Sequence, residues 1–84
     1  MNFGERLKQL RAVRNLTQKQ LAIETETSER GIQNYEMGIR KPAFDVLIAL
    51  ADYFDVSLDY LVGRSDEPER RWNRLSLLRL DGGR

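Results

Sequence analysis

Polar side chains with hydrogen-bonding groups surround two apolar residues between positions 28 and 36 of this 84-residue chain. Ile32 and Tyr35 lie three positions apart, so on a helix they share one face. Such groups match base edges: a guanidinium pairs with guanine, an amide with adenine, and a carboxylate accepts from the cytosine amino group. The segment therefore predicts a helix whose outward face carries groups that suit base edges in the major groove; an ordinary polar helix surface fits the same pattern. The outward residues are Ser28, Glu29, Arg30, Gln33 and Asn34.

Groups suited to binding phosphate lie on either side of this segment. A helix is expected to begin at Gln18, directly after Thr17, and the free N–H groups at a helix N-terminus attract phosphate. Arg40 and Lys41 form a basic loop after the helix at 28–36. We expect these four residues to contact the DNA backbone, which positions a protein without reading sequence. Arg14 and Lys19 are further candidates.

Other kinds of chemistry need residue types that the chain lacks. Cysteine and histidine are both absent, which removes disulfides, ordinary zinc sites, thiol nucleophiles and imidazole catalysis. Carboxylates are present, but neither a nucleophile–base arrangement nor a phosphate-cradling glycine loop accompanies them. We therefore expect no enzyme, no metal, no cofactor and no small-molecule substrate.

The chain also lacks the sequence signals of membrane insertion and secretion. Its longest apolar run, residues 46–51, is far shorter than the ~18–20 residues of a membrane span. The N-terminus has no basic stretch followed by an apolar core. We expect no membrane partner and a cytoplasmic location.

Charge is distributed unevenly along the chain. The total is +1, with +3 over residues 1–42, −4 over residues 43–63 and +2 over residues 64–84. A basic first half is what contact of one face with a polyanion requires. A solvated surface with chance clustering of charges gives the same pattern, so charge alone does not decide.

Helical periodicity and capping residues predict the elements that carry these groups. No segment alternates polar and apolar residues convincingly, so strands are not expected. Thr17 with Gln20 forms a capping box, and Ser28 and Ser57 are favourable N-caps. The fourth helix is expected to turn Phe44 inward with the apolar residues that follow it. We expect an all-α fold with helices over residues 3–14, 18–24, 28–36, 43–54 and 58–62.

The composition changes after residue 63. We expect a compact helical domain over residues 1–63, the part to which the helix-turn-helix resemblance described below applies, and a tail over residues 64–84. An apolar stripe between Trp72 and Leu80 predicts a sixth, amphipathic helix over residues 68–80. That helix needs something to pack against, because an isolated helix of about 12 residues is marginal in water.

Ordered motifs along most of the chain extend the pattern of the central segment. The sequence QKQLA at 18–22 precedes SERGIQNYE at 28–36, and Gly4–Leu7, Gly38–Pro42 and residues 50–63 carry matching motifs around them. Together these motifs resemble the lambda repressor/Cro-like (XRE) family of helix-turn-helix proteins. The resemblance covers about residues 3–63, roughly three quarters of the chain.

The resemblance implies a compact five-helix, lambda-repressor-like domain and a DNA-binding transcriptional regulator, with repression as the expected mode of action. Its implied partner is double-stranded DNA, bound by a homodimer on a pseudo-palindromic operator. It implies that Gln18 binds the DNA backbone. It also implies that Arg11 pairs with Glu36 to hold the reading helix, and that Arg11 shares a phosphate.

Three residues depart from the family pattern. Glu26 stands where the family usually has a turn glycine, which costs about 1–2 kcal/mol if the backbone there is left-handed. Thr27 replaces the usual buried Val or Ile of that turn. Gly31 lies inside the reading helix and costs about 1 kcal/mol relative to alanine. None of the three removes a group that contacts DNA.

Two matters stay open at the level of sequence. The same five helices also suit a protein-binding module, such as an antitoxin or an adaptor whose tail captures a partner. The dimer surface is formed either by exposed apolar residues of the fourth and fifth helices, such as Tyr53 and Tyr60, or by the stripe from Trp72 to Leu80, unless the tail folds back on its own domain.

Overall fold

The computed structural model describes residues 1–69, which form five α-helices and no β-strand. All five predicted helices are present, each end within one residue of its expected place, so the all-α fold is confirmed. Of the helix expected over residues 68–80, positions 68 and 69 are not helical, and the remainder lies outside the described residues. The helices are α1 (Phe3–Val13), α2 (Gln18–Glu24), α3 (Glu29–Glu36), α4 (Phe44–Phe54) and α5 (Leu58–Leu61).

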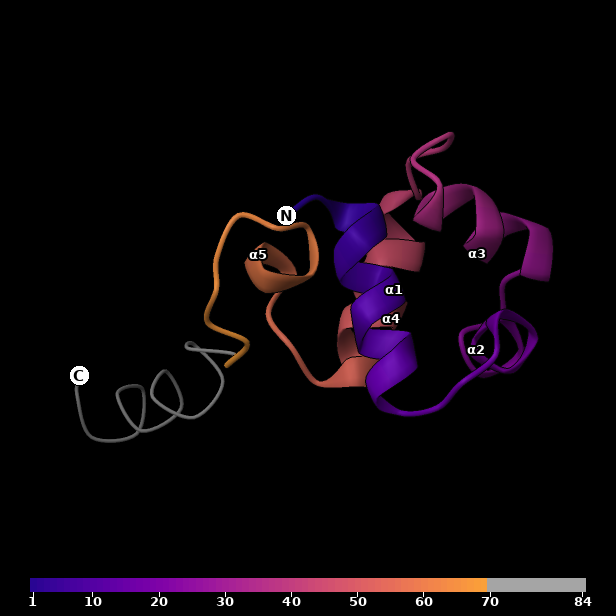
Figure 1. Cartoon of the computed structure of the whole chain (residues 1–84), viewed down its shortest axis with the longest axis horizontal. Helices are drawn as coiled ribbons and strands as arrows, with labels where there is room; N and C mark the ends of the chain where they lie inside the picture. The colour runs from indigo at the N-terminus through magenta and orange to yellow at the C-terminus, as the bar shows by residue number, and fades with distance from the viewer. Residues whose placement is uncertain (70–84) are drawn as a thin grey trace.

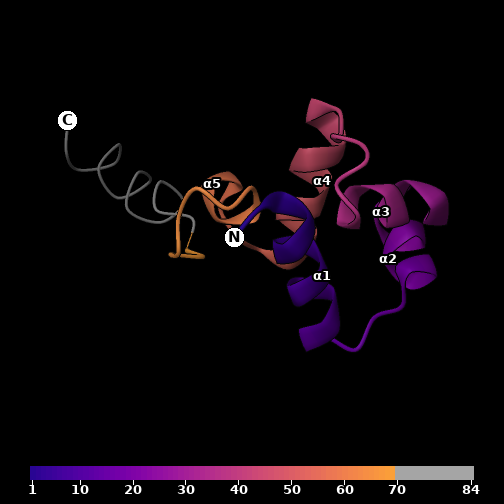
Figure 2. The ribbon, with the colours of Figure 1, turned by 45° about the horizontal axis from the view of Figure 1, so that its top comes forward.

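The five helices form a domain with two distinct ends. α1 and α4 cross its middle, α2 and α3 lie together at one end, and α5 lies at the other beside the N-terminus (Figure 1). The turned view in Figure 2 keeps the same order. The helix expected to read bases is therefore remote from α5. None of the helices within residues 1–69 is long and apolar enough to cross a membrane.

Hydrogen bonds at the helix starts confirm the predicted caps. The Thr17 hydroxyl accepts from the backbone N–H of Gln20 at 3.0 Å, and the Gln20 side chain accepts from the Thr17 N–H at 2.8 Å. Ser28 and Ser57 cap α3 and α5, each accepting from the N–H three residues on at 3.0 Å. A second capping box, at Asn2, begins α1 and was not predicted. Local side chains thus fix where these four helices start.

One large aliphatic side chain from each helix is fully shielded from solvent. Burying a side chain of this size contributes about 1.5–3 kcal/mol, so all five helices depend on one common centre. The dependence is greatest for α5, whose four residues are too few for a helix that is stable alone. The five side chains are Leu7, Leu21, Ile32, Leu50 and Leu61.

Phe44 corrects the prediction that the whole apolar stripe of α4 faces inward. Leu50 and Phe54 are buried and Leu47 is half-buried, but 73% of Phe44 is exposed. In Figure 2 the first turn of α4 extends beyond α1. Helical spacing identified the correct face of α4, but it does not determine how much of that face is covered.

Residues 64–69 lie against the α5 end of the domain. The Pro68 carbonyl accepts from the Ser57 N–H at 2.9 Å. Arg6, almost fully buried, places its guanidinium 3.7 Å from the centre of the Tyr60 ring and donates to the Ser65 carbonyl at 3.5 Å. The packed structure therefore continues past residue 63, at the end of the domain that is remote from α3.

The turn between α2 and α3 is left-handed at Glu26, the residue that stands where the family usually has a glycine. Glu26 has φ of +56°. Thr27 is half-buried, and its hydroxyl lies 3.1 Å from that of Thr25, which donates to the Leu21 carbonyl at 2.8 Å. Hydroxyl hydrogen bonds therefore hold this turn where the family usually has an apolar contact.

Replacing Glu26 with glycine should raise the free energy of unfolding by about 0.5–1 kcal/mol. Glycine removes a left-handed Cβ penalty of about 1–2 kcal/mol, partly offset by about 0.5–1 kcal/mol of extra entropy in the unfolded chain. Denaturant unfolding measures the change. The control Glu26→Ala keeps the penalty and should leave stability nearly unchanged. Equal stabilisation by both variants would attribute the gain to loss of the carboxylate instead.

Candidate nucleic-acid interface

Apolar contacts anchor the inner face of α3. Ile32 is fully buried. Tyr35 is half-buried, and its ring centroid lies 6.2 Å from that of Phe3 in α1, at an interplanar angle of 55°. Both residues point inward, as their spacing predicted, so the opposite face of α3 is turned outward.

A close backbone approach sets the distance between α1 and the end of α3. A Cβ atom at Gly4 would stand 2.7 Å from the carbonyl oxygens of both Tyr35 and Glu36. Such contacts are far shorter than van der Waals separation, and backbone atoms have little freedom to give way. Sequence reasoning assigned Gly4 no role of its own. The only sequence signal was a glycine inside an otherwise regular helical pattern, which often has a packing reason.

A buried carboxylate joins α3 to both helices that precede it. Arg11 donates to Glu36 twice, from Nε to Oε2 at 2.6 Å and from Nη2 to Oε1 at 3.0 Å. Gln18, the first residue of α2, donates from Nε2 to Oε1 at 3.1 Å. The Glu36 side chain is only 4% exposed. The pair implied by the family resemblance is present, and its bidentate geometry fixes direction as well as distance.

The same interaction acts on the pKa of Arg11, which is charged in any case. The hydrogen bond to Glu36 raises the pKa of Arg11, while desolvation by burial lowers it in part. A raised pKa favours folding at every pH below the value in the unfolded chain, and for arginine that covers the range in which proteins fold. The Arg11 side of this pair therefore does not act as a pH switch.

The five candidate base-reading residues lie on the outward side of α3. Glu29, Arg30 and Gln33 are exposed. Ser28 is exposed too, but its hydroxyl accepts from the Gly31 N–H as the N-cap. Asn34 is half-buried, and its carbonyl accepts from the N–H groups of the next loop. Four exposed side chains and one at the edge form a polar surface, and their role in reading bases stays a prediction.

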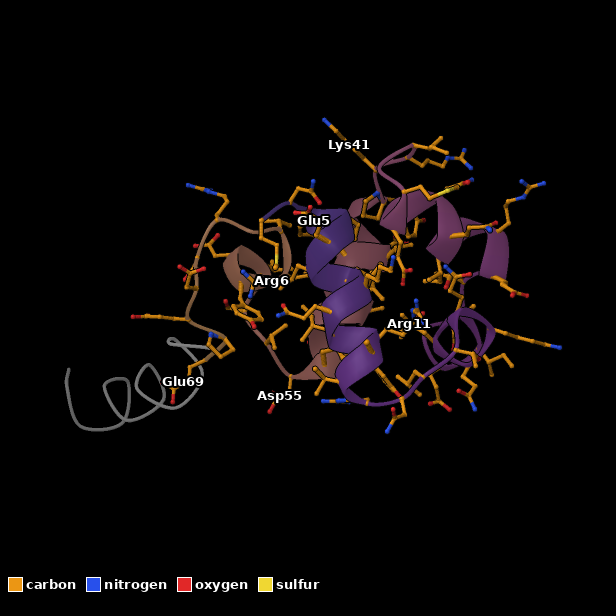
Figure 3. All side chains as sticks on the ribbon, viewed as in Figure 1. Glu5, Arg6, Arg11, Lys41, Asp55 and Glu69 are labelled. Atoms are coloured by element: carbon orange, nitrogen blue, oxygen red, sulfur yellow. The ribbon has the colours of Figure 1, made fainter. Side chains whose placement is uncertain are left out.

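The basic loop after α3 projects from the same end of the domain. Arg40 and Lys41 are both exposed, and Figure 3 shows Lys41 extending away from the ribbon. Gly38 has φ of +77° where the loop begins. The N–H of Ile39 donates to the Asn34 carbonyl at 3.0 Å. The loop is thus attached to the last turn of α3, so the two cations keep a fixed relation to the reading helix.

The other phosphate candidates have side chains that are already engaged. The Thr17 hydroxyl serves as the cap of α2, and the Gln18 amide donates to Glu36. Arg11 donates from Nη1 to the Leu16 carbonyl at 2.8 Å in addition to its pair with Glu36. A phosphate at this end would therefore meet backbone N–H groups of α2 and the remaining N–H groups of Arg11.

Arg14 has hydrogen-bond partners within the domain, and its contact with phosphate stays a prediction. Its Nη1 and Nη2 atoms donate to the carbonyls of Tyr53 and Phe54 at 3.1 and 3.2 Å. These carbonyls belong to the last turn of α4, where a cation is favourable because that end carries partial negative charge. Its guanidinium also lies 5.1 Å from the Phe54 ring centre. Arg14 thus joins α1 to α4.

The reading helix is continuous through its glycine. α3 runs from Glu29 to Glu36 without a break at Gly31. A Cβ atom there would meet the Ser28 hydroxyl at 3.1 Å and otherwise only the edge of the Tyr35 ring at 3.9 Å. Packing within the domain thus leaves nearly enough room for alanine. Within residues 1–69, no group of three His, Cys, Asp or Glu side chains is arranged to hold a metal ion.

Comparison with known proteins agrees with this geometry. A family model described as helix-turn-helix matches residues 7–61. The chain belongs to the helix-turn-helix family, in its XRE or Cro/C1 branch. This helix-turn-helix chain is 38% identical to the uncharacterized regulator YobD of Bacillus subtilis, over 89% of the chain and 67% of YobD. It is 36% identical to RstR, a transcriptional repressor of a cryptic phage in Vibrio cholerae, over 89% of the chain and 69% of RstR.

Solved structures share the fold. The P22 c2 repressor in complex with a synthetic operator has a TM-score of 0.73 at 26% identity, covering 77% of this chain and 98% of that one. A transcriptional regulator from Listeria innocua has a TM-score of 0.71 at 36% identity, covering 93% of this chain and 70% of that one. The curated regulators ImmR and YqaE are longer, and the chain spans 52% and 57% of their lengths.

Gly4→Ala should destabilise this helix-turn-helix domain by about 1–3 kcal/mol, the usual cost of overpacking. The added methyl group must push the end of α3 away from α1. Thermal unfolding measures the loss, and amide chemical shifts of residues 35–37 report the displacement. Gly31→Ala is the matched control: helix propensity gains up to about 1 kcal/mol while the Ser28 hydroxyl must give way slightly, so its cost should be clearly smaller than that of Gly4→Ala. Similar stability of the two variants would contradict the role given to Gly4.

Proposed function

We propose that this chain is a sequence-specific transcriptional regulator that inserts α3 into the major groove of double-stranded DNA. The observation that carries the proposal is the two-sided character of α3. Its inner face is anchored by Ile32, Tyr35 and Glu36, while its outward face carries hydrogen-bonding side chains. Relatives described as transcriptional regulators, and a similar repressor crystallised with its operator, support it.

The outward side chains suit the chemistry of the major groove. An α-helix fits this groove, where each base pair presents its own pattern of donors and acceptors. Arg30 is suited to guanine, Gln33 or Asn34 to adenine, and Glu29 to the amino group of cytosine. Ser28 is suited to either base of a pair. A helix that is fixed before binding loses less freedom on docking, which improves affinity.

Phosphate contacts orient α3 in the groove without reading sequence. Arg40 and Lys41 bind the backbone from the loop after α3. Thr17 and Gln18 present the N-terminus of α2 to a second phosphate, and Arg11 shares that phosphate through its remaining N–H groups. These contacts give binding that weakens as salt rises.

In this role the protein acts without catalysis or a cofactor. Binding at a promoter represses transcription by excluding the polymerase from the same DNA. A cytoplasmic location follows from a partner that is genomic DNA.

Replacing Arg30 and Gln33 together with alanine should remove sequence preference and leave weak, salt-dependent binding. Each good bidentate base contact is worth about 1–3 kcal/mol, so affinity for the selected operator should fall about 10²–10⁴-fold. The operator comes from selection of bound sequences from a random duplex pool, and titrations at several salt concentrations measure affinity.

The exposed pair Lys8 and Gln9 on α1 supplies the matched control. Alanine at both positions removes one cation and one amide, as in the test variant, and should leave operator preference intact. A test variant that still prefers the operator would contradict the assignment of α3. Wild-type protein that binds duplexes without salt dependence would instead favour a protein-binding module.

We also propose that the protein binds as a homodimer on a pseudo-palindromic operator, because one such module buries little DNA surface. Tyr53 and Tyr60, one candidate surface, are both half-buried, and the Tyr60 ring lies beneath the Arg6 guanidinium. This coverage favours the second candidate, the apolar stripe from Trp72 to Leu80, which lies outside the described residues.

Truncation after Glu69 should weaken self-association at least tenfold while leaving the domain folded. The cut spares the hydrogen bonds of Pro68 and Glu67 to Ser57. Sedimentation measures association, and circular dichroism with thermal unfolding checks the fold. An unchanged dimer would assign the interface to the first 69 residues. Lost helicity with an unchanged unfolding midpoint would give the tail a helix of its own.

A further inference from the structure

Exposed apolar residues are concentrated in the sequence between the end of α3 and the first residue of α4. Six large hydrophobic residues are exposed in the described part of the chain, and three of them fall within residues 37–44. They are Met37 at 58%, Ile39 at 68% and Phe44 at 73% exposure. We refer to residues 37–44 as the apolar–basic loop, because Arg40 and Lys41 lie between Ile39 and Phe44. Clustered exposed apolar groups mark interaction surfaces more often than single ones do.

Backbone hydrogen bonds hold the first part of the loop that carries these exposed side chains. The N–H of Met37 donates to the Gln33 carbonyl at 3.0 Å, and those of Ile39 and Arg40 both donate to the Asn34 carbonyl, at 3.0 and 3.4 Å. Pro42 restricts the backbone just before α4. The backbone of residues 37–40 is thus held to the last turn of α3, and Phe44 is held by α4.

The charges of the loop indicate which surface covers it. Arg40 and Lys41 are exposed among the apolar residues, and residues 37–44 contain no acidic residue. A second copy of the chain placed face to face here would bring like charges together in an apolar interface, which is unfavourable. Asp45, next to Phe44, is an exposed carboxylate that also accepts from the Val46 N–H, and the two cations outnumber it. A polyanion with apolar parts satisfies both kinds of side chain at once.

We propose that Ile39 and Phe44 pack against deoxyribose rings of the DNA backbone whose phosphates Arg40 and Lys41 bind. This inference rests on the proposed function, and it assigns the loop a second, uncharged mode of contact. A DNA strand alternates anionic phosphates with sugars whose C–H groups are apolar. Alternating cationic and apolar side chains match that order. Sugars are the same at every base, so the contact adds affinity without adding sequence preference.

The two kinds of contact differ in their response to salt. Lys41→Ala removes a phosphate contact and should lower the slope of log affinity against log salt by about one. Phe44→Ala removes apolar area only, so the slope should stay unchanged. We expect Phe44→Ala to bind about tenfold more weakly, and Ile39→Ala about threefold, on both the selected operator and a random duplex.

The experiment measures dissociation constants of the full chain for both duplexes over a series of salt concentrations. Val13→Ala on α1 is the matched control, since Val13 is 75% exposed and lies at the C-terminal end of α1, away from the loop. It should bind as the wild type does. Thermal unfolding checks that each variant keeps its stability, as expected for an exposed side chain, and Phe44→Leu should recover part of the affinity.

Three outcomes would overturn the inference. Phe44→Ala that binds like Val13→Ala, while wild-type protein binds with salt dependence, would reject the sugar contact and leave the proposed function standing. Wild-type protein that binds neither duplex with salt dependence would reject both. Loss of self-association by Phe44→Ala in sedimentation without DNA would assign the patch to a second copy of the chain.

Discussion

The place of α3 depends on a carboxylate that folding removes from water. Glu36 is held by two donors of Arg11 and one of Gln18. Burial of such a pair stabilises little compared with apolar packing, because desolvation offsets much of the attraction. Once the carboxylate is buried, however, loss of a partner leaves a charge without compensation. The pair therefore selects one arrangement of α1, α2 and α3 and penalises the others.

Packing contributes the stability and the close positioning of α3 that the buried carboxylate does not provide. Ile32 and the ring of Tyr35 fix which face of α3 is covered, and Gly4 fixes how near its last turn stands to α1. An eight-residue helix with an internal glycine is marginal by itself. Its order before binding therefore comes from tertiary contacts, and these contacts all lie on the side opposite the outward polar residues.

A feature could be predicted from sequence when the residues that cause it lie close together along the chain. The five helices, the capping box at Thr17 and the inward direction of Ile32 depend on residues a few positions apart, and these predictions were right. The Arg11–Glu36 pair spans 25 positions and came only from family resemblance. The exposure of Phe44 depends on what covers that end of α4 in space, and no local pattern contains that information. The outward groups of α3 could be named from sequence, but not the base that each one reads.

Long-range contacts also separate the two ends of the domain. Arg6 is buried beneath residues 64–69. The Tyr60 ring of α5, together with the Ser65 carbonyl and the Asp66 carboxylate, compensates its charge. Because this segment packs on α1 and α5, it leaves the outward face of α3 uncovered (Figure 1). The described chain ends at the far side of the domain from α3.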